Sequence, residues 1–133
     1  MLVAPWNSRF ETGIDLIDAQ HKSLFEAINT LADAFKAGNA KNQVRVSLEF
    51  LIDYTVDHFQ SEERLMREMD YPRLGEHMGE HARLMEQVRD LQTELLEGKP
   101  VTMDVTIFLA EWLKVHIHDS DMAYVYFLKE QHQ

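Results

Sequence analysis

The sequence contains no cysteine, and only three prolines and five glycines occur among its 133 residues. The absence of cysteine excludes disulfide bonds, thiolate metal sites and thiol nucleophiles, and it is consistent with a reducing compartment. The scarcity of proline and glycine, together with 45% hydrophobic and 27% charged residues, indicates an ordered chain and not a disordered tail. We therefore expect residues 1–133 to form a single domain.

The chain also lacks a clustered basic patch and any long hydrophobic run. Its net charge of −10 repels phosphate backbones and anionic lipids, which argues against nucleic acid as a partner. No hydrophobic run approaches the length of a transmembrane helix. The opening segment MLVAPWNSRFETG has proline and polar residues where a signal peptide has an apolar core. We expect no membrane insertion and a cytoplasmic location.

Hydrophobic side chains recur at every third or fourth position along most of the chain, which is the pattern of helices with one apolar face. The pattern predicts four helices, over residues 18–37, 41–69, 74–97 and 102–129. Because the connections between them are short, neighbouring helices should run antiparallel. We predict an all-α fold, an antiparallel up-down-up-down four-helix bundle.

Further signals lie at the helix ends and in the first residues. Gly38-Asn39 and Gly98-Lys99-Pro100 are typical of helix C-termini, and Thr102 is a suitable N-cap for the last helix. Residues 1–14 show no sustained period and contain proline and glycine, so we expect an extended N-terminal arm. This arm should pack across the body through three apolar side chains: Trp6, Phe10 and Ile14.

Two pairs of potential metal ligands lie on consecutive helices, on either side of the turn at Tyr71-Pro72. His58 and Glu62 are four residues apart, and so are His77 and His81. A step of four residues in a helix brings two side chains to one face, where they can bind one metal or two neighbouring metals. His58 and Glu62 also continue an apolar stripe, on which an unpaired carboxylate is strongly disfavoured.

Three further candidates depend more on context. His21 lies in the apolar stripe of the first helix, where a lone histidine is more often a hydrogen-bonded core residue than a ligand. His116 and Asp121 are five residues apart, a step that leaves them about 140° apart around a regular helix. Either Asp121 is not a ligand or the helix contains a local wide turn there. Other polar residues are assigned to solvated faces: Glu63, His118 and His132.

The position of each candidate along its helix shows which candidates can lie close together in the bundle. In an up-down-up-down bundle, the start of the first helix lies beside the end of the second, the start of the third and the end of the fourth. The candidates all fall near that end, and unrelated buried polar residues would have no reason to share one level. We therefore predict a joint metal site with these ligands: His21, His58, Glu62, His77, His81, His116 and Asp121.

The ligand types indicate which metal this site would bind. Five imidazoles and two carboxylates exceed one tetrahedral zinc site, whereas two octahedral ions bridged by both carboxylates would use all of them. Three histidines on one ion and two on the other leave one coordination position open. The mixed nitrogen and oxygen shell suits iron, and its low negative charge favours reversible binding over oxidation of a substrate.

These positions, with the flanking segments GIDLIDAQHKSLF, HFQSEE, YP and WLKVHI, resemble the hemerythrin family, most closely its single-domain bacteriohemerythrins. The resemblance covers almost the whole chain. It implies that one iron is bound by three histidines: His77, His81 and His116. The other iron is then bound by His21 and His58, while Glu62 and Asp121 bridge the two. Asp119 stands where many relatives have glycine, which is a departure in the last ligand segment.

The same resemblance implies the cofactor and its ligand. The cofactor would be two Fe ions, as Fe²⁺ or Fe³⁺, with an oxo or hydroxo bridge, and O₂ would bind at the open position of the two-histidine iron. That position must be dry for binding to remain reversible. Four apolar side chains are expected to form its wall: Leu113, Trp112, Phe25 and Phe59. Phe59 and Trp112 would serve equally as ordinary core residues, whereas for Leu113 the resemblance favours a place over the O₂ position.

Two classes of function follow from this site. The first, which we favour, is reversible O₂ binding for storage, delivery or buffering. The second is O₂ or NO sensing, or iron handling, with the same site. An enzyme is not expected, because no second constellation of acid, base and nucleophile is present.

Overall fold

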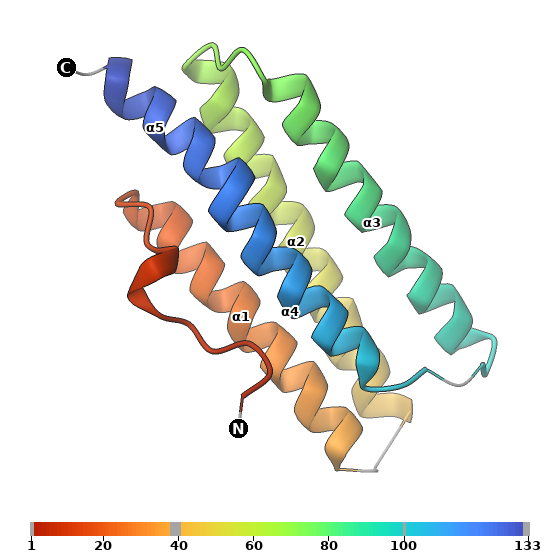
Figure 1. The fold of residues 1–133 in the computed structure, drawn as a ribbon. Helices are drawn as coiled ribbons and strands as arrows, with labels where there is room; N and C mark the ends of the chain where they lie inside the picture. The colour runs from red at the N-terminus through yellow and green to blue at the C-terminus, as the bar shows by residue number, and fades with distance from the viewer. Residues whose placement is uncertain (1, 38–40, 100, 132–133) are drawn as a thin grey trace.

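The computed structural model describes residues 2–37, 41–99 and 101–131. Within these residues the chain is helical, with no strand, and four rods lie antiparallel in an up-down-up-down bundle, as predicted (Figure 1). The fourth rod is a continuous run of three segments. The elements are η1 (Ser8–Phe10), α1 (Asp15–Lys36), α2 (Lys41–Glu68), α3 (Leu74–Leu96), α4 (Asp104–His116), the π-helix η2 (Ile117–Asp121) and α5 (Met122–Gln131).

The helix starts differ from the predicted ones by a few residues. The first helix begins at Asp15, three residues earlier than expected, and the fourth begins at Asp104. The prediction that Thr102 is the N-cap is wrong, because the N-cap is the next residue and Thr102 lies before it, where its carbonyl accepts the amide of Val105. Met103 holds the N-cap position without a side-chain hydrogen bond. The predicted end at Gly38-Asn39 and residue Pro100 lie outside the described residues.

Two helices end in the same backbone motif. After α3, Gly98 adopts φ 78° and the amides of Gly98 and Lys99 bond to the carbonyls of Leu95 and Glu94. After α2, Asp70 adopts φ 55°, and the amides of Asp70 and Tyr71 bond to the carbonyls of Arg67 and Met66. Both are Schellman motifs, which satisfy carbonyls left free at a helix end. The second motif turns the chain so that α3 returns along α2.

The core has two parts. The larger apolar cluster includes Leu24, Phe59 and Leu113, and a smaller one contains Met66 and Tyr124 with their neighbours. Along α2 and the fourth rod, residues of the larger cluster come first and residues of the smaller cluster follow several positions later. Between the two clusters, Glu62 on α2 and Asp121 on the fourth rod are buried but belong to neither apolar cluster.

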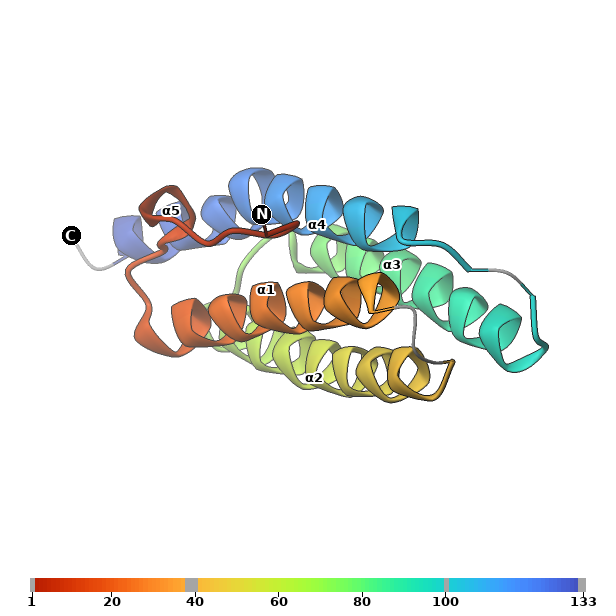
Figure 2. The same ribbon diagram turned by 90° about the horizontal axis from the view of Figure 1, so that it is seen from below.

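The N-terminal arm lies along the seam between α1 and the fourth rod (Figure 2). The rings of Trp6 and Phe25 meet edge to face, with centroids 5.3 Å apart, and Phe10 lies 5.1 Å from Phe25. Ala4 is fixed by two hydrogen bonds to the side chain of Asn29, of 2.8 and 2.9 Å. The predicted packing through Trp6, Phe10 and Ile14 is confirmed, because all three are partly buried against the core.

None of the helices in the described part of the chain combines the length and apolar character that crossing a membrane requires.

Candidate metal centre

The seven predicted ligands meet between the two apolar clusters, and each is almost completely buried, with at most 4% of its surface exposed. Every rod contributes to the centre. Helix α1 provides His21, α2 provides His58 and Glu62, α3 provides His77 and His81, and the fourth rod provides His116 and Asp121. The structure therefore brings together residues that are up to 100 positions apart in the sequence, from His21 to Asp121.

Asp121 lies among three histidines from three different rods. Its Oδ1 is 2.9 Å from His77 Nε2 and 3.1 Å from His116 Nε2. Its Oδ2 is 3.1 Å from His21 Nε2. The two oxygens of one carboxylate therefore face different histidines, which is the geometry of a side chain that can bridge two ions.

Glu62 occupies an equivalent position. Its Oε1 is 3.2 Å from His58 Nε2 and 3.4 Å from His81 Nε2, and its Oε2 is 3.8 Å from His21 Nε2. Like Asp121, it contacts histidines from more than one rod.

The ligand atoms fall into two overlapping groups, within each of which they lie within 4.8 Å of one another. The three-histidine group contains His77, His81 and His116, and the two-histidine group contains His21 and His58. Glu62 and Asp121 belong to both groups. Two sites that share both carboxylates are the arrangement of a dinuclear centre.

The polar atoms of this centre are short of partners. Several are buried and, although other predicted ligand atoms lie close to them, make no hydrogen bond of acceptable geometry in the described structure: both ring nitrogens of His21, Glu62 Oε1, His77 Nε2 and both oxygens of Asp121. A buried polar group left unsatisfied costs about 1–3 kcal/mol, so their concentration at one point would be strongly destabilising. Two cations would satisfy these lone pairs, and the donor set of imidazole nitrogen and carboxylate oxygen suits iron. The residues present therefore fit a di-iron group.

The π-helix explains how His116 and Asp121 can both face the centre. The amide of Met122 bonds to the carbonyl of Ile117, a step of five residues. The predicted wide turn is therefore confirmed. It adds about one residue to the helical turn, which cancels most of the angular offset between residues five apart. The departure at Asp119 is accommodated there, because its carboxylate is exposed and bonds to neighbouring His118 Nδ1, at 2.8 Å.

Several outer residues hold the histidines, and the sequence interpretation missed them. His81 Nδ1 lies 2.8 Å from Glu63 Oε2, and His58 Nδ1 lies 2.8 Å from Gln20 Oε1. A histidine that binds metal through Nε2 carries its proton on Nδ1, so both contacts are hydrogen bonds donated by the ring. The assignment of Glu63 to the solvated face was wrong, because its side chain is only 17% exposed and turns towards α3.

Tyr124 is another outer residue that contacts one of the predicted ligands. Its hydroxyl is fully buried and donates to Glu62 Oε2 at 2.7 Å. The single-helix pattern placed it on the apolar face, which is where it lies. That pattern does not reveal a hydrogen bond to a second helix. His118 is exposed, as predicted, whereas His132 lies outside the described residues.

In the metal-free centre, burial and the neighbouring charges shift the pKa values of the predicted ligands in opposite directions. Burial lowers the pKa of His21, but Asp121 and Glu62 outweigh it and raise that pKa from 6.5 to about 9. Burial raises the pKa of Glu62, yet His58, His21 and His81 hold it well below its usual value. The pKa of Asp121 is likewise lowered, because His116 and His21 outweigh burial and the charge of Glu62. Both carboxylates are therefore ionised and available as ligands.

Three of the four residues expected to form the O₂ pocket wall line the same cavity. Phe59, Trp112 and Leu113 line an apolar cavity of about 30 Å³ that continues into the larger cluster. Phe59 stacks on His81, with centroids 3.6 Å apart and planes within 3°, and Trp112 stacks on His116 at 4.5 Å. Phe25 is not among the described residues that line this cavity, because it packs against the arm instead.

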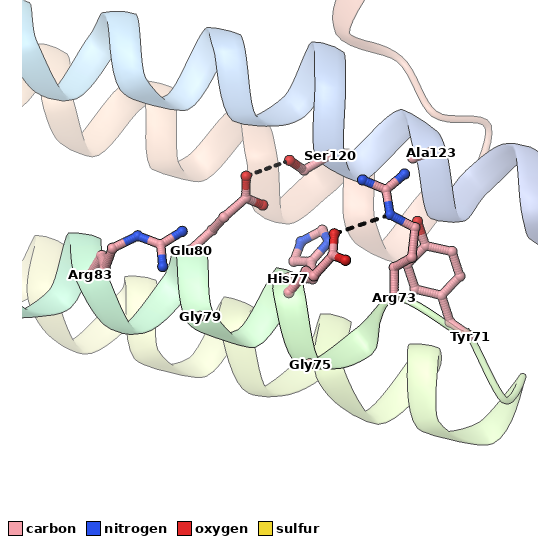
Figure 3. A pocket seen from close by; sticks show the side chains of 10 residues that line it. Tyr71, Arg73, Gly75, His77, Gly79, Glu80, Arg83, Ser120 and Ala123 are labelled. Carbon is pink, nitrogen blue, oxygen red and sulfur yellow. Dashed lines mark hydrogen bonds and ion pairs between the residues drawn. The ribbon is translucent and has the colours of Figure 1, made fainter.

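A second cavity reaches the centre from the surface. A groove of about 330 Å³ separates the start of α3 from η2 and α5, and His77, Glu80 and Ser120 are among its lining residues (Figure 3). The hydroxyl of Ser120 donates to Glu80 Oε1 at 2.9 Å across this groove. The other oxygen, Glu80 Oε2, lies 3.6 Å from His116 Nδ1.

Comparisons with known proteins agree with this geometry. A family model described as "Hemerythrin HHE cation binding domain" matches residues 12–128. A bacteriohemerythrin of Methylococcus capsulatus is 36% identical over 126 residues, which are 93% of this chain and 95% of the relative. Myohemerythrin-1 of Phascolopsis gouldii is 32% identical over 120 residues, 90% of this chain and 89% of the relative. A crystal structure of wild-type hemerythrin superposes with a TM-score of 0.86 at 36% identity, over 90% of this chain and 93% of that one.

Proposed function

The chain belongs to the hemerythrin family of O₂-binding di-iron proteins, and on this premise we propose which of its residues hold the irons and keep O₂ binding reversible. His77, His81 and His116 hold one iron, and His21 and His58 hold the other. Glu62 and Asp121 bridge the two. The observation that carries this assignment is that both carboxylates belong to both groups of ligand atoms.

The division of ligands determines where O₂ binds. One iron would be held by three histidines and the other by two, with both carboxylates shared between them. The iron held by His21 and His58 would therefore keep a coordination position free for O₂. The two irons would supply the electrons that O₂ requires.

The remaining residues exclude water and orient the ligands. Leu113, Phe59 and Trp112 line a largely apolar cavity, whose wall offers water few hydrogen-bond partners. The Tyr124 hydroxyl fixes Glu62, and Gln20 fixes His58. The protein supplies orientation and dryness, and the irons supply the chemistry.

At the level of the cell, we propose that the chain stores, delivers or buffers O₂ in the cytoplasm and is not an enzyme. The absence of cysteine supports a reducing compartment. We also propose that residues 1–133 form one di-iron domain in which residues 1–14 are an arm, and the family match over residues 12–128 supports the extent of this domain.

Anaerobic reconstitution tests the assignment. Metal-free protein is loaded with Fe²⁺, its iron is counted, and it is taken through repeated cycles of O₂ and vacuum while the charge-transfer absorption of the irons is followed. We expect two irons per chain and absorption bands that appear and disappear over many cycles. His77→Ala should lower the iron content, whereas His118→Ala, which changes an exposed histidine, should not. One iron per chain at full loading, or bands lost after the first cycle, would contradict the proposal.

A further inference from the structure

The histidines of the two groups differ in what lies behind them. In the three-histidine group, His81 Nδ1 lies 2.8 Å from the carboxylate of Glu63. His116 Nδ1 lies 3.6 Å from the carboxylate of Glu80. Two of the three imidazoles in this group therefore face a negative charge on the side away from the centre.

Among the described residues, no such charge faces the Nδ1 atoms of the two-histidine group. His58 Nδ1 is 2.8 Å from the side-chain amide oxygen of Gln20, which is a neutral acceptor. Gln20 is held in turn by Ser61, whose hydroxyl oxygen accepts from Gln20 Nε2 at 3.2 Å. His21 Nδ1 is buried and has no hydrogen-bond partner among the described residues. The two carboxylates that are not themselves predicted ligands, Glu63 and Glu80, thus both lie behind the three-histidine group.

This asymmetry has a direct consequence for metal ions. A carboxylate that accepts the Nδ1 proton makes an imidazole a stronger electron donor to a metal at Nε2. The negative charge also stabilises the ion of higher charge, and the interaction is weakly screened when the groups are buried. Both effects favour Fe³⁺ over Fe²⁺ on the side where the carboxylates lie.

We propose that Glu63 and Glu80 are positioning residues that divide the oxidation states between the two irons. They make the three-histidine iron the harder of the two to reduce, so that a chain carrying one Fe³⁺ and one Fe²⁺ keeps the Fe³⁺ with His77, His81 and His116. The Fe²⁺ then sits with His21 and His58, beside the open position. This inference rests on the proposed di-iron function and adds a role for residues outside the ligand set.

The two carboxylates should not contribute equally. Glu63 makes a hydrogen bond and its side chain is 17% exposed, whereas Glu80 is farther from its histidine and its side chain is 37% exposed. Solvent screens the second charge more strongly. Ser120, in the π-helix, holds Glu80 in place across the groove (Figure 3). The wide turn that aims Asp121 at the centre therefore also places the residue that holds Glu80.

Stepwise reduction of the fully ferric protein tests the proposal. Dithionite, acting through mediator dyes, supplies one electron to each Fe³⁺, and no bond between protein atoms is made or broken. In the unaltered chain the first electron should reduce the two-histidine iron and the second the three-histidine iron. The two midpoints are read from the absorption spectrum, and the amount of mixed-valence protein is read from its electron paramagnetic resonance signal.

Glu63→Gln removes the charge and keeps a hydrogen-bond acceptor of the same size. Changes of such outer partners usually alter metal affinity by about 10- to 100-fold, and we expect Glu63→Gln to weaken the binding of Fe³⁺ at the three-histidine iron more than the binding of Fe²⁺. The second midpoint should rise more than the first, and the yield of mixed-valence protein at one electron per chain should fall. Glu80→Gln should act in the same direction to a smaller extent.

Gln20→Glu is the converse variant, because it places a carboxylate next to His58 Nδ1, as Glu63 does next to His81 Nδ1. It should lower the first midpoint and leave the second nearly unchanged. Glu86→Gln removes an exposed charge of the same kind from α3 and should move neither midpoint. Thermal unfolding of each variant identifies any that fail to fold, in which case Glu80→Gln and Gln20→Glu still test the asymmetry.

Iron counting separates this inference from the proposed function. If all variants bind two irons and Glu63→Gln moves the second midpoint, both proposals stand. If they bind two irons but Glu63→Gln moves the first midpoint more, or moves neither, the asymmetry is overturned and the di-iron function remains. If the unaltered chain does not bind two irons, the proposed function itself fails.

Discussion

Asp121 Oδ1 lies 3.1 Å from His116 Nε2, although the two residues are five positions apart in one continuous helical rod. The π-helix between them makes this possible, since a regular helix would point the two side chains in different directions. Because the other oxygen of Asp121 faces His21, this one turn connects the two halves of the centre.

The two carboxylates that we propose as bridges, Glu62 and Asp121, should control how much iron the chain holds. Asp121→Ala or Glu62→Ala removes a ligand from both ions at once, so iron content should fall to one ion per chain or to none. Elemental analysis of protein from iron-replete cells measures this directly. Asp119→Ala, two residues away on the exposed side of the π-helix, is the matched control and should retain two irons. Full iron content in Asp121→Ala would show that this carboxylate is not a bridge.

Leu113 should protect the oxygenated form. Leu113→Ala enlarges the cavity beside the centre and admits water, so the oxygenated protein should decay faster while iron content stays near normal. Removing a buried leucine side chain also costs about 2–5 kcal/mol of stability. Leu48→Ala, which truncates a buried leucine outside the lining of this cavity, provides the comparison. An equal decay rate in both variants at similar stability would assign Leu113 a packing role only.

Tyr124 should stabilise the fold through its hydroxyl. Tyr124→Phe removes the 2.7 Å hydrogen bond to Glu62 and leaves a buried carboxylate oxygen with one partner fewer. A hydrogen bond to a charged group contributes about 1.5–3 kcal/mol, and the loss should appear as a lower urea midpoint of the metal-free protein. Tyr126→Phe, which removes an exposed hydroxyl, should leave the midpoint unchanged.

Metal-free protein should be most stable in mildly acidic solution. The folded-state pKa of His21 is raised from 6.5 to about 9, so its contribution is complete below pH 6.5 and is lost as the pH rises towards 9. The folded-state pKa values of Glu62 and Asp121 are lowered from 4.5 and 3.8, so their contribution is present above these values and is lost at lower pH. Urea midpoints of chelator-treated protein should therefore be higher at pH 6 than at pH 9. His21→Gln should flatten this difference, and an unchanged slope in that variant would refute the assignment to His21.

Alanine substitutions of two glycines, one within α3 and one just after it, should change the stability of the protein in opposite directions. Gly98 follows α3 with φ 78°, a conformation that costs a residue with a Cβ about 1–2 kcal/mol, so Gly98→Ala should destabilise the protein. Gly79 lies inside α3, and an added Cβ would meet only Arg83 Nη1, at an ordinary 3.4 Å. Gly79→Ala should stabilise the protein by about 0.5–1 kcal/mol. Thermal unfolding of the two variants measures both signs, and shifts in the same direction would contradict this account of the helix end.

Much of the fold could be predicted because the apolar residues repeat with the period of a helix. The same period placed His58, Glu62, His77 and His81 on buried faces, and the short connections put them at one level. The five-residue spacing of His116 and Asp121 even indicated the wide turn, since only a departure from a regular helix could make both of them ligands.

The outer contacts of the site could not be predicted in this way. Glu63 has the spacing of a solvated residue on its own helix, and only the distance between α2 and α3 shows that it reaches His81. Phe25 has the spacing of a wall residue, but the arm over α1 provides its partners. Periodicity gives the direction of a side chain from its own helix. It does not give the distance to the next one.

The groove beside α3 has a consequence for how long the protein survives in a cell. Helix α3 packs closely on α2 but diverges from α4 towards its C-terminal end (Figures 1 and 2). At its other end, His77 and His81 reach across to Asp121 and His116. Iron bound between these side chains would hold α3 to the fourth rod. Without it α3 would be held mainly by α2, and a helix that opens from the bundle is a substrate for proteases. The supply of iron would then set the lifetime of the chain as well as its capacity for oxygen.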